Sequence, residues 1–269
     1  MATSDFKIGN NDQKFVTCEL SHDAILVEYF YQSTRSMQNS NRKINVGIII
    51  EPGVLLMDIV GIQSIFGFCD NVNLIHVGKS CEVVTAWGGL PVAATTRYAD
   101  CPPLDVLAVG AMGLEVYSDP ETLRFVRRQA SNSPYLVGIC AGVLLFGAAG
   151  LLVGKRATTN LQCVDRLSDF GCEVIEGGGV VEDGRLLTAG PATGGFEAGL
   201  VLLAKIFDVH TAKLMELNVE YHPQPVYGVG SAALAGAELT QQVMQLGKPY
   251  FSRCGELAVD SYKNSSWLV

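Results

Sequence analysis

The sequence predicts an α/β fold built on a mainly parallel, doubly wound sheet. From residue 44 onward, short apolar runs rich in Val and Ile alternate with helical segments. Such runs are typical of strands buried on both faces, and their alternation with helices is typical of parallel sheets. Of the 269 residues, 48% are hydrophobic and 29 are glycine, which suits a globular domain with many tight turns.

The predicted elements follow one another along the chain. Strands are expected at 44–50, 73–77, 82–87, 105–110, 134–139 and 185–189, and helices at 58–69, 141–150, 194–207 and 210–220. Another helix is expected to start within the run from Ser118 to Glu121, which offers a cap, a proline near the first turn and an early acid.

Two terminal segments flank this pattern. Residues 1–43 are predicted to form an arm, in which the polar segment 32–43 is a linker. A helix is predicted over 19–31, because an apolar stripe recurs there at helical spacing, formed by Leu20, Ala24, Val27 and Tyr31. The catalytic domain is predicted to span 44–230, and residues 231–269 are expected to be an extension that packs on it.

Charge and composition argue against several classes of protein. The net charge is −8 with a pI of about 5.0, and no run of Lys and Arg could follow a phosphate backbone. No apolar stretch reaches the ~18 residues of a membrane span, and the polar N-terminus lacks a secretory signal. The 8 cysteines show no paired metal-ligand spacing and are predicted to be reduced. We therefore expect a cytoplasmic protein with no metal site that binds neither nucleic acid nor membranes.

The strongest local signal is the run from Gly138 to Gly142, with Cys140 at its centre. It follows a predicted strand and opens a predicted helix, which is the cysteine form of the nucleophile elbow. Glycines on both sides relieve the crowding of this tight turn, and the thiol is expected at the carboxyl edge of the sheet. The start of the next helix favours the thiolate, so a lowered thiol pKa is predicted. The alternative interpretation is an ordinary buried cysteine.

Several stretches resemble the ThiJ/PfpI branch of the class I glutamine-amidotransferase-like superfamily, and within it the isonitrile hydratases. The resemblance covers about 44–230 and is carried by IIIEPGVLLMDIVG at 48–61, GICAGVLLFGAAGLLVGKRATT at 138–159, TAGPATGGFEAGLVLL at 188–203 and EYHPQP at 220–225. It implies a flavodoxin-like three-layer sandwich, a homodimer, a small-molecule substrate and covalent catalysis by Cys140 without a cofactor.

The resemblance also implies roles for residues near the predicted nucleophile. Asp58 matches an acidic residue that approaches the cysteine in relatives and serves as acid/base; its alternative role is a helix cap. The segment from Gly110 to Gly113 resembles a loop that forms an oxyanion-type pocket with the N–H after the nucleophile, here that of Ala141. Its alternative role is a simple strand-end turn. Ala111 and Met112 stand where relatives carry paired glycines. The candidate pocket is formed by Gly110, Ala111, Met112 and Gly113.

Two departures from the relatives leave the substrate open. Ala141 replaces a usual threonine, and Asn160 replaces a usual histidine. No histidine forms a clear pair with Cys140; the candidates are His22, His76, His210 and His222.

If the family reaction applies, Cys140 adds to an isonitrile, Asp58 moves the proton, and water releases an N-substituted formamide. Three alternatives stay open. One is another cysteine-dependent reaction, either hydration of a glyoxal or a biosynthetic step on a larger natural product. Another is a non-catalytic small-molecule sensor, and the least favoured is a protease, because no histidine follows Cys140.

Overall fold

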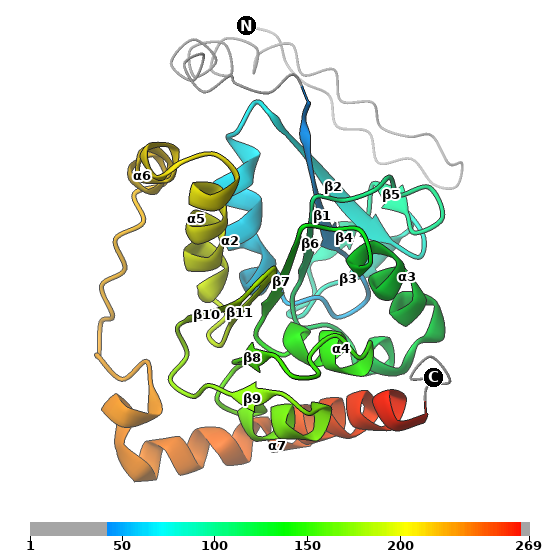
Figure 1. Cartoon of the computed structure of the whole chain (residues 1–269). Helices are drawn as coiled ribbons and strands as arrows, with labels where there is room; N and C mark the ends of the chain where they lie inside the picture. The colour runs from blue at the N-terminus through cyan, green and yellow to red at the C-terminus, as the bar shows by residue number, and fades with distance from the viewer. Residues whose placement is uncertain (1–41, 265–269) are drawn as a thin grey trace, which may run out of the picture. The chain divides into compact units, whose positions relative to one another are not determined.

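The computed structural model describes residues 42–264 of the chain, so the helix predicted at 19–31 and nearly all of the linker predicted at 32–43 lie outside the described residues. The main sheet has seven strands in the order β10-β11-β7-β6-β1-β2-β5 (Figure 1). These strands are β1 (Ile44–Ile49), β2 (Val72–Gly78), β5 (Thr96–Arg97), β6 (Val106–Val109), β7 (Tyr135–Ile139), β10 (Val180–Asp183) and β11 (Leu186–Ala189). Every neighbouring pair is parallel except β10 and β11.

Helices cover both faces of this sheet, so the predicted three-layer α/β sandwich is confirmed. Helix α2 (Leu56–Gly67) packs on α5 (Gly194–Ile206) on one face, and α3 (Pro120–Ala130) and α4 (Gly142–Ala148) lie on the other (Figure 1). Strand β1 lies between β2 and β6 in the sheet and between the two helical layers, so its Val46, Ile48 and Ile49 are fully buried.

The predicted start of α3 is confirmed. Asp119 is the N-cap, and its side chain accepts a hydrogen bond from the Thr122 N–H at 2.8 Å, while Pro120 occupies the first turn. Helix α6 (Val209–Asn218) likewise begins at a carboxylate cap, Asp208.

The strand predicted at 82–87 exists but does not join the main sheet. Strand β3 (Val83–Thr85) pairs with β4 (Pro91–Ala93) in a separate antiparallel hairpin, which turns at Gly88 and Gly89, both with positive φ. The remaining short elements are η2 (Leu114–Ser118), η3 (Val164–Phe170) and a second two-stranded sheet of β8 (Arg156–Ala157) and β9 (Glu173–Val174).

The C-terminal segment forms the long helix α7 (Ala232–Asn264), interrupted by non-helical dihedrals at Gly236. Helix α7 packs against η2, α4 and η3. Gly255 permits this close approach, since a Cβ there would come within 2.9 Å of Arg166 Cγ. Cys254 and Ala258 of the same helix are fully buried.

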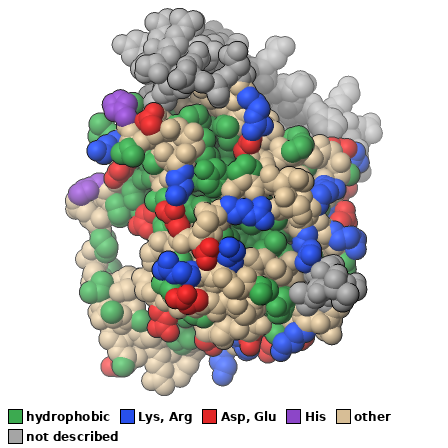
Figure 2. Space-filling model, viewed as in Figure 1, with side chains coloured by type: hydrophobic (Ala, Val, Ile, Leu, Met, Phe, Trp, Pro, Cys, Tyr) green, Lys and Arg blue, Asp and Glu red, His purple; other side chains and the backbone are tan. Residues whose placement is uncertain are grey.

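The described surface carries mixed charge. On the face seen in Figure 2, basic and acidic side chains are interspersed, and no continuous basic stripe crosses it. Within residues 42–264, no helix has both the length and the apolar character needed to cross a membrane.

Candidate active site

The carboxyl ends of parallel strands bring the candidate residues to one edge of the sheet. Ile139, the last residue of β7, pairs with Ala189 of β11, and the next residue, Cys140, donates its backbone N–H to the Ala189 carbonyl at 2.9 Å. The segment 110–113 leaves β6 at the same edge. Parallel α/β sheets bind ligands at this edge.

Cys140 sits on a strained turn, as expected for a nucleophile elbow. Its φ is +54°, a left-handed value that a side chain rarely adopts and that costs on the order of 1–3 kcal/mol. Gly142 allows the turn, because a Cβ there would lie 2.4 Å from the carbonyl oxygen of Val109. The backbone of α4 therefore approaches the end of β6 in a way that only glycine permits.

The Cys140 thiol is buried, and its pKa is raised rather than lowered. The side chain is 5% exposed. Burial raises the pKa of Cys140 well above its ordinary value, and the charges of Asp58 and Cys163 add to this, while hydrogen bonds from Ala141 N–H and Asn160 oppose it. The predicted lowering of the pKa was wrong in sign, because the helix start does not outweigh desolvation. Ala141 itself is fully buried and contributes its backbone N–H to the sulfur.

Asn160 contacts the sulfur directly. Its Nδ2 lies 3.3 Å from Cys140 Sγ and 3.0 Å from Cys163 Sγ. The orientation of the amide is fixed, since its Oδ1 accepts the backbone N–H of Gln162 at 2.9 Å, which leaves only Nδ2 to face the sulfurs. Sequence reasoning noted Asn160 only as a departure from relatives, and nothing in the pattern indicated Cys163 as its second partner.

Asp58 is the carboxylate of this site. It is fully buried in the first turn of α2, but it does not cap that helix, so the cap interpretation is excluded. Its Oδ2 accepts the Ala111 N–H at 2.7 Å, and its Oδ1 is buried without a hydrogen-bond partner among the described residues. Burial raises the pKa of Asp58 to about 7, against smaller opposing effects of the Ala111 N–H and the Cys140 thiol.

The segment 110–113 holds Asp58 rather than offering free donors. Gly110 makes room for the carboxylate, because a Cβ there would lie 2.7 Å from Asp58 Cβ. The three following N–H groups are engaged: Ala111 donates to Asp58, Met112 to the Tyr117 hydroxyl at 3.3 Å, and Gly113 to the Pro52 carbonyl at 2.8 Å. An oxyanion at this loop would have to displace one of these protein acceptors.

Helix α7 also reaches this loop. The Tyr250 hydroxyl donates to the carbonyl oxygen of Met112, and the side chains of Tyr250, Tyr117 and Cys254 interact with one another. Both tyrosines couple electrostatically to the Cys140 thiol. Sequence reasoning missed Tyr117 and Tyr250 because no motif marks them.

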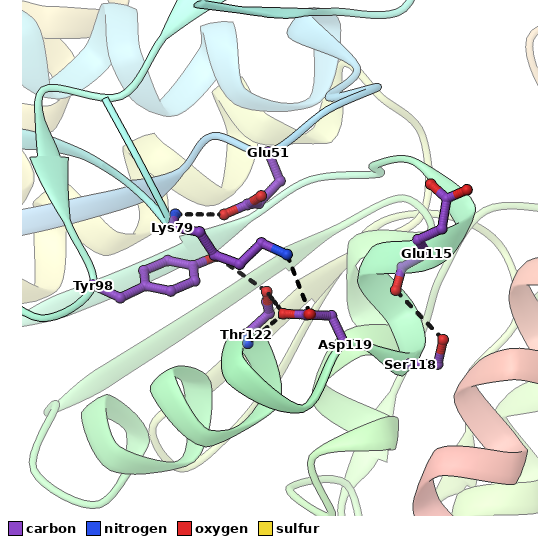
Figure 3. Close-up of polar contacts among 7 residues, drawn as sticks. All are labelled: Glu51, Lys79, Tyr98, Glu115, Ser118, Asp119 and Thr122. Carbon is purple, nitrogen blue, oxygen red and sulfur yellow. Dashed lines mark hydrogen bonds and ion pairs between the residues drawn. The ribbon is translucent and has the colours of Figure 1, made fainter. Parts of the chain in front are cut away.

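A polar network fixes the chain just before α2 (Figure 3). Glu51 is almost fully buried and accepts the Lys79 backbone N–H at 2.7 Å, while the Lys79 ammonium lies 3.1 Å from Asp119. The Asp119 carboxylate also accepts the Thr122 hydroxyl at 2.7 Å, and Tyr98 donates to that hydroxyl at 3.5 Å. This network ties the end of β1 to β2 and to the start of α3, and it contains no contact to Cys140.

The described histidines do not assist Cys140. His76 bonds to Gln63 at 2.7 Å, and His210 and His222 are exposed; His22 lies outside the described residues. Among residues 42–264, no group of three or more His, Cys, Asp or Glu side chains is arranged to hold a metal ion.

The chain is similar to known proteins over most of its length. The DJ-1/PfpI family model matches residues 45–205. The isonitrile hydratase of Pseudomonas putida is 35% identical over 208 residues, which is 77% of this chain and 91% of that protein. This span is longer than the predicted 44–230.

Solved structures give the same picture. A ThiJ/PfpI family protein from Pseudomonas syringae has a TM-score of 0.76 and 32% identity, covering 80% of this chain and 90% of the other. Drosophila melanogaster DJ-1beta has a TM-score of 0.59 and 17% identity, covering 66% of this chain and 98% of the other, and it supports the fold alone.

Proposed function

Because the chain belongs to the DJ-1/PfpI family, we propose that it is a cysteine-dependent hydratase that converts an isonitrile and water into an N-substituted formamide. Cys140 is the nucleophile, and Asp58 transfers the protons. The relative named isonitrile hydratase supports this choice of reaction. The reaction needs no cofactor, because covalent catalysis divides the hydration into two accessible steps.

In the first step, the sulfur of Cys140 bonds to the terminal carbon of the isonitrile. Asp58 takes the thiol proton and delivers it to that carbon, giving a thioimidate and restoring the carboxylate. In the second step, water adds to the same carbon while Asp58 takes one of its protons and passes it to nitrogen. The carbon–sulfur bond then breaks, the thiol regains a proton from the new hydroxyl, and the formamide leaves.

The observation that carries the proposal is the buried pair of Asp58 and Cys140. Asp58 has one oxygen held by Ala111 and a second oxygen that no other described donor holds, and its carboxylate is favoured by the neighbouring Cys140 thiol. With a pKa of about 7, the carboxyl group can both accept and release a proton near neutral pH. A thiol with a raised pKa needs such a base, because it is not ionised by itself.

Restricted access to the thiol also suits this substrate class. Cys140 is 5% exposed and Asp58 is not exposed at all. An isonitrile is linear at its reacting end, so its terminal carbon presents little bulk to a buried thiol.

The sulfur of Cys140 keeps polar contacts although Ala141 and Asn160 depart from the relatives. The N–H of Ala141 still donates to Cys140, and Asn160 stands beside the sulfur as a donor. We infer that Asn160 stabilises the thiolate as it forms, and that the segment 110–113 acts by holding Asp58.

The test is a substrate panel. Purified protein is incubated separately with alkyl and aryl isonitriles and with matched glyoxals, with boiled protein as control, and products are identified by NMR. We expect formamides from at least one isonitrile class. Hydration of glyoxals without any formamide would reject the proposal in favour of the rival reaction of the superfamily.

A further inference from the structure

Helix α7 lies beyond the 45–205 region that the family model matches, yet one of its side chains reaches the loop that holds Asp58. We propose that Tyr250 is a positioning residue of the active site, which acts by fixing the Ala111–Met112 segment so that the Ala111 N–H points at Asp58. The proposal rests on the proposed roles of Cys140 and Asp58.

Met112 is held between two tyrosine hydroxyls, which together are called the clamp. Its N–H donates to the Tyr117 hydroxyl at 3.3 Å, and its carbonyl oxygen accepts the Tyr250 hydroxyl. Met112 is fully buried, so water cannot replace either partner. Both polar groups of this residue are therefore bound by tyrosine hydroxyls, one from η2 and one from α7.

The backbone links the clamp to the carboxylate of Asp58. Met112 directly follows Ala111, whose N–H donates to Asp58 Oδ2 at 2.7 Å and whose carbonyl oxygen accepts the Leu55 N–H at 2.8 Å. A shift of the Ala111–Met112 peptide would strain the bond from Leu55 and displace the Ala111 N–H, the donor that lowers the pKa of Asp58. Tyr250 acts on Asp58 through this peptide segment and not by contact.

Aromatic neighbours set the direction of the Tyr250 hydroxyl. The ring of Trp87 packs edge-on against the Tyr250 ring at 5.1 Å between centroids, and Phe251 does so at 5.0 Å. Trp87 belongs to the β3–β4 hairpin turn, so the ring is held between that hairpin and α7. These contacts restrict the rotamer and aim the hydroxyl at Met112.

The titratable groups around Asp58 determine how its pKa responds to the loss of the Tyr250 hydroxyl. Among the described residues, Cys140 is the titratable group that affects Asp58, and Cys163, Tyr117 and Tyr250 in turn couple to Cys140. Tyr250 stays neutral at working pH, because burial raises its pKa. Loss of its hydroxyl therefore changes geometry and not charge.

The experiment compares Tyr250→Phe with wild type and with Tyr227→Phe, a matched change at an exposed tyrosine. Infrared titration follows the protonated carboxyl band that is lost in Asp58→Asn, so Asp58 is read without substrate. We expect the Tyr250→Phe midpoint to lie above the wild-type value and the Tyr227→Phe midpoint to equal it. Wherever isonitrile turnover is measurable, kcat should fall about 10- to 100-fold, the scale of a slight misplacement, with KM nearly unchanged.

Tyr117→Phe removes the other half of the clamp and should shift the midpoint in the same direction. It also keeps the test open if Tyr250→Phe does not fold, as judged by near-UV circular dichroism. An unchanged Asp58 midpoint in a folded Tyr250→Phe protein would overturn the positioning role. If the Asp58 midpoint shifts in Tyr250→Phe but wild type turns over no isonitrile, the positioning role is supported and the proposed reaction is rejected.

Discussion

Asn160 offers the sharpest test of how the chain controls its thiol. Its Nδ2 donates to Cys140 Sγ at 3.3 Å, and the Gln162 N–H prevents the amide from flipping. Asn160→Ala removes this donor and leaves the Ala141 N–H as the remaining one at the sulfur. Because the donor favours the thiolate, the pKa of Cys140 should rise further when it is lost.

The size of the shift follows from the type of bond. A hydrogen bond to a charged group contributes about 1.5–3 kcal/mol, and sulfur is a weak acceptor, so we take the lower end of this range. Since about 1.4 kcal/mol corresponds to one pKa unit, the midpoint should rise by about one unit and the thiolate fraction below it should fall about tenfold. Asn160→Asp should raise the midpoint more, because it adds a like charge.

The assay is the pH dependence of iodoacetamide labelling, mapped to Cys140 by mass spectrometry. The midpoint is compared and not the absolute rate, because the smaller side chain also opens access. Cys81 is exposed and serves as the reference thiol in every sample. Cys81 should label before Cys140, in contrast to the sequence expectation of a lowered thiol pKa at Cys140. A midpoint for Cys140 in Asn160→Ala that equals the wild-type midpoint would refute the role of Asn160.

Asp58→Asn should lower turnover about 100-fold or more, the scale of a general acid/base. Folding raises the pKa of Asp58 from 3.8 to about 7, so the free energy of unfolding of wild type should fall by on the order of a few kcal/mol as the pH rises between these values, and that of Asp58→Asn should not. Parallel pH dependence of the two proteins in chemical denaturation would contradict this. Gly142→Ala should destabilise the fold by about 3 kcal/mol or more, since its Cβ would lie 2.4 Å from Val109 O, and a wild-type melting temperature would count against the elbow packing. Deletion of residues 1–40, followed by light scattering and activity, tests the predicted homodimer and arm: a monomeric full-length protein would reject the dimer, and an unchanged dimer with unchanged activity would make the arm dispensable.

The central strands of the sheet could be predicted from the sequence because they are buried on both faces, whereas β5 and β10 at its edges are partly exposed. The run from Ile44 to Ile49 is apolar at nearly every position, and β6 and β7 show the same signature. Strand β3 was predicted as another strand, but its side chains are alternately exposed and it lies in a separate hairpin. Local sequence does not distinguish a hairpin strand from a strand of the main sheet. Helix α7 was not predicted as a helix because Gly236 and Pro249 interrupt its pattern.

The candidate site could be predicted only in part. The glycines around Cys140 mark a tight turn, and that signal is local. The pKa of the thiol depends on burial beneath segments that are distant in sequence, so its sign could not be obtained from the helix start alone. The contacts of Asn160 and Tyr250 likewise arise from tertiary packing; Tyr250 lies 138 residues from its partner Met112.

Whether Cys140 forms the bond to substrate can be measured by comparing Cys140→Ala with Cys163→Ala. Both thiols are buried and both contact Asn160, so the two variants match in site and chemistry. Initial rates of formamide formation are measured on folded proteins with the best isonitrile of the panel. We expect Cys140→Ala to produce no formamide above the buffer rate while Cys163→Ala retains measurable turnover. Turnover by Cys140→Ala within tenfold of wild type would contradict this expectation.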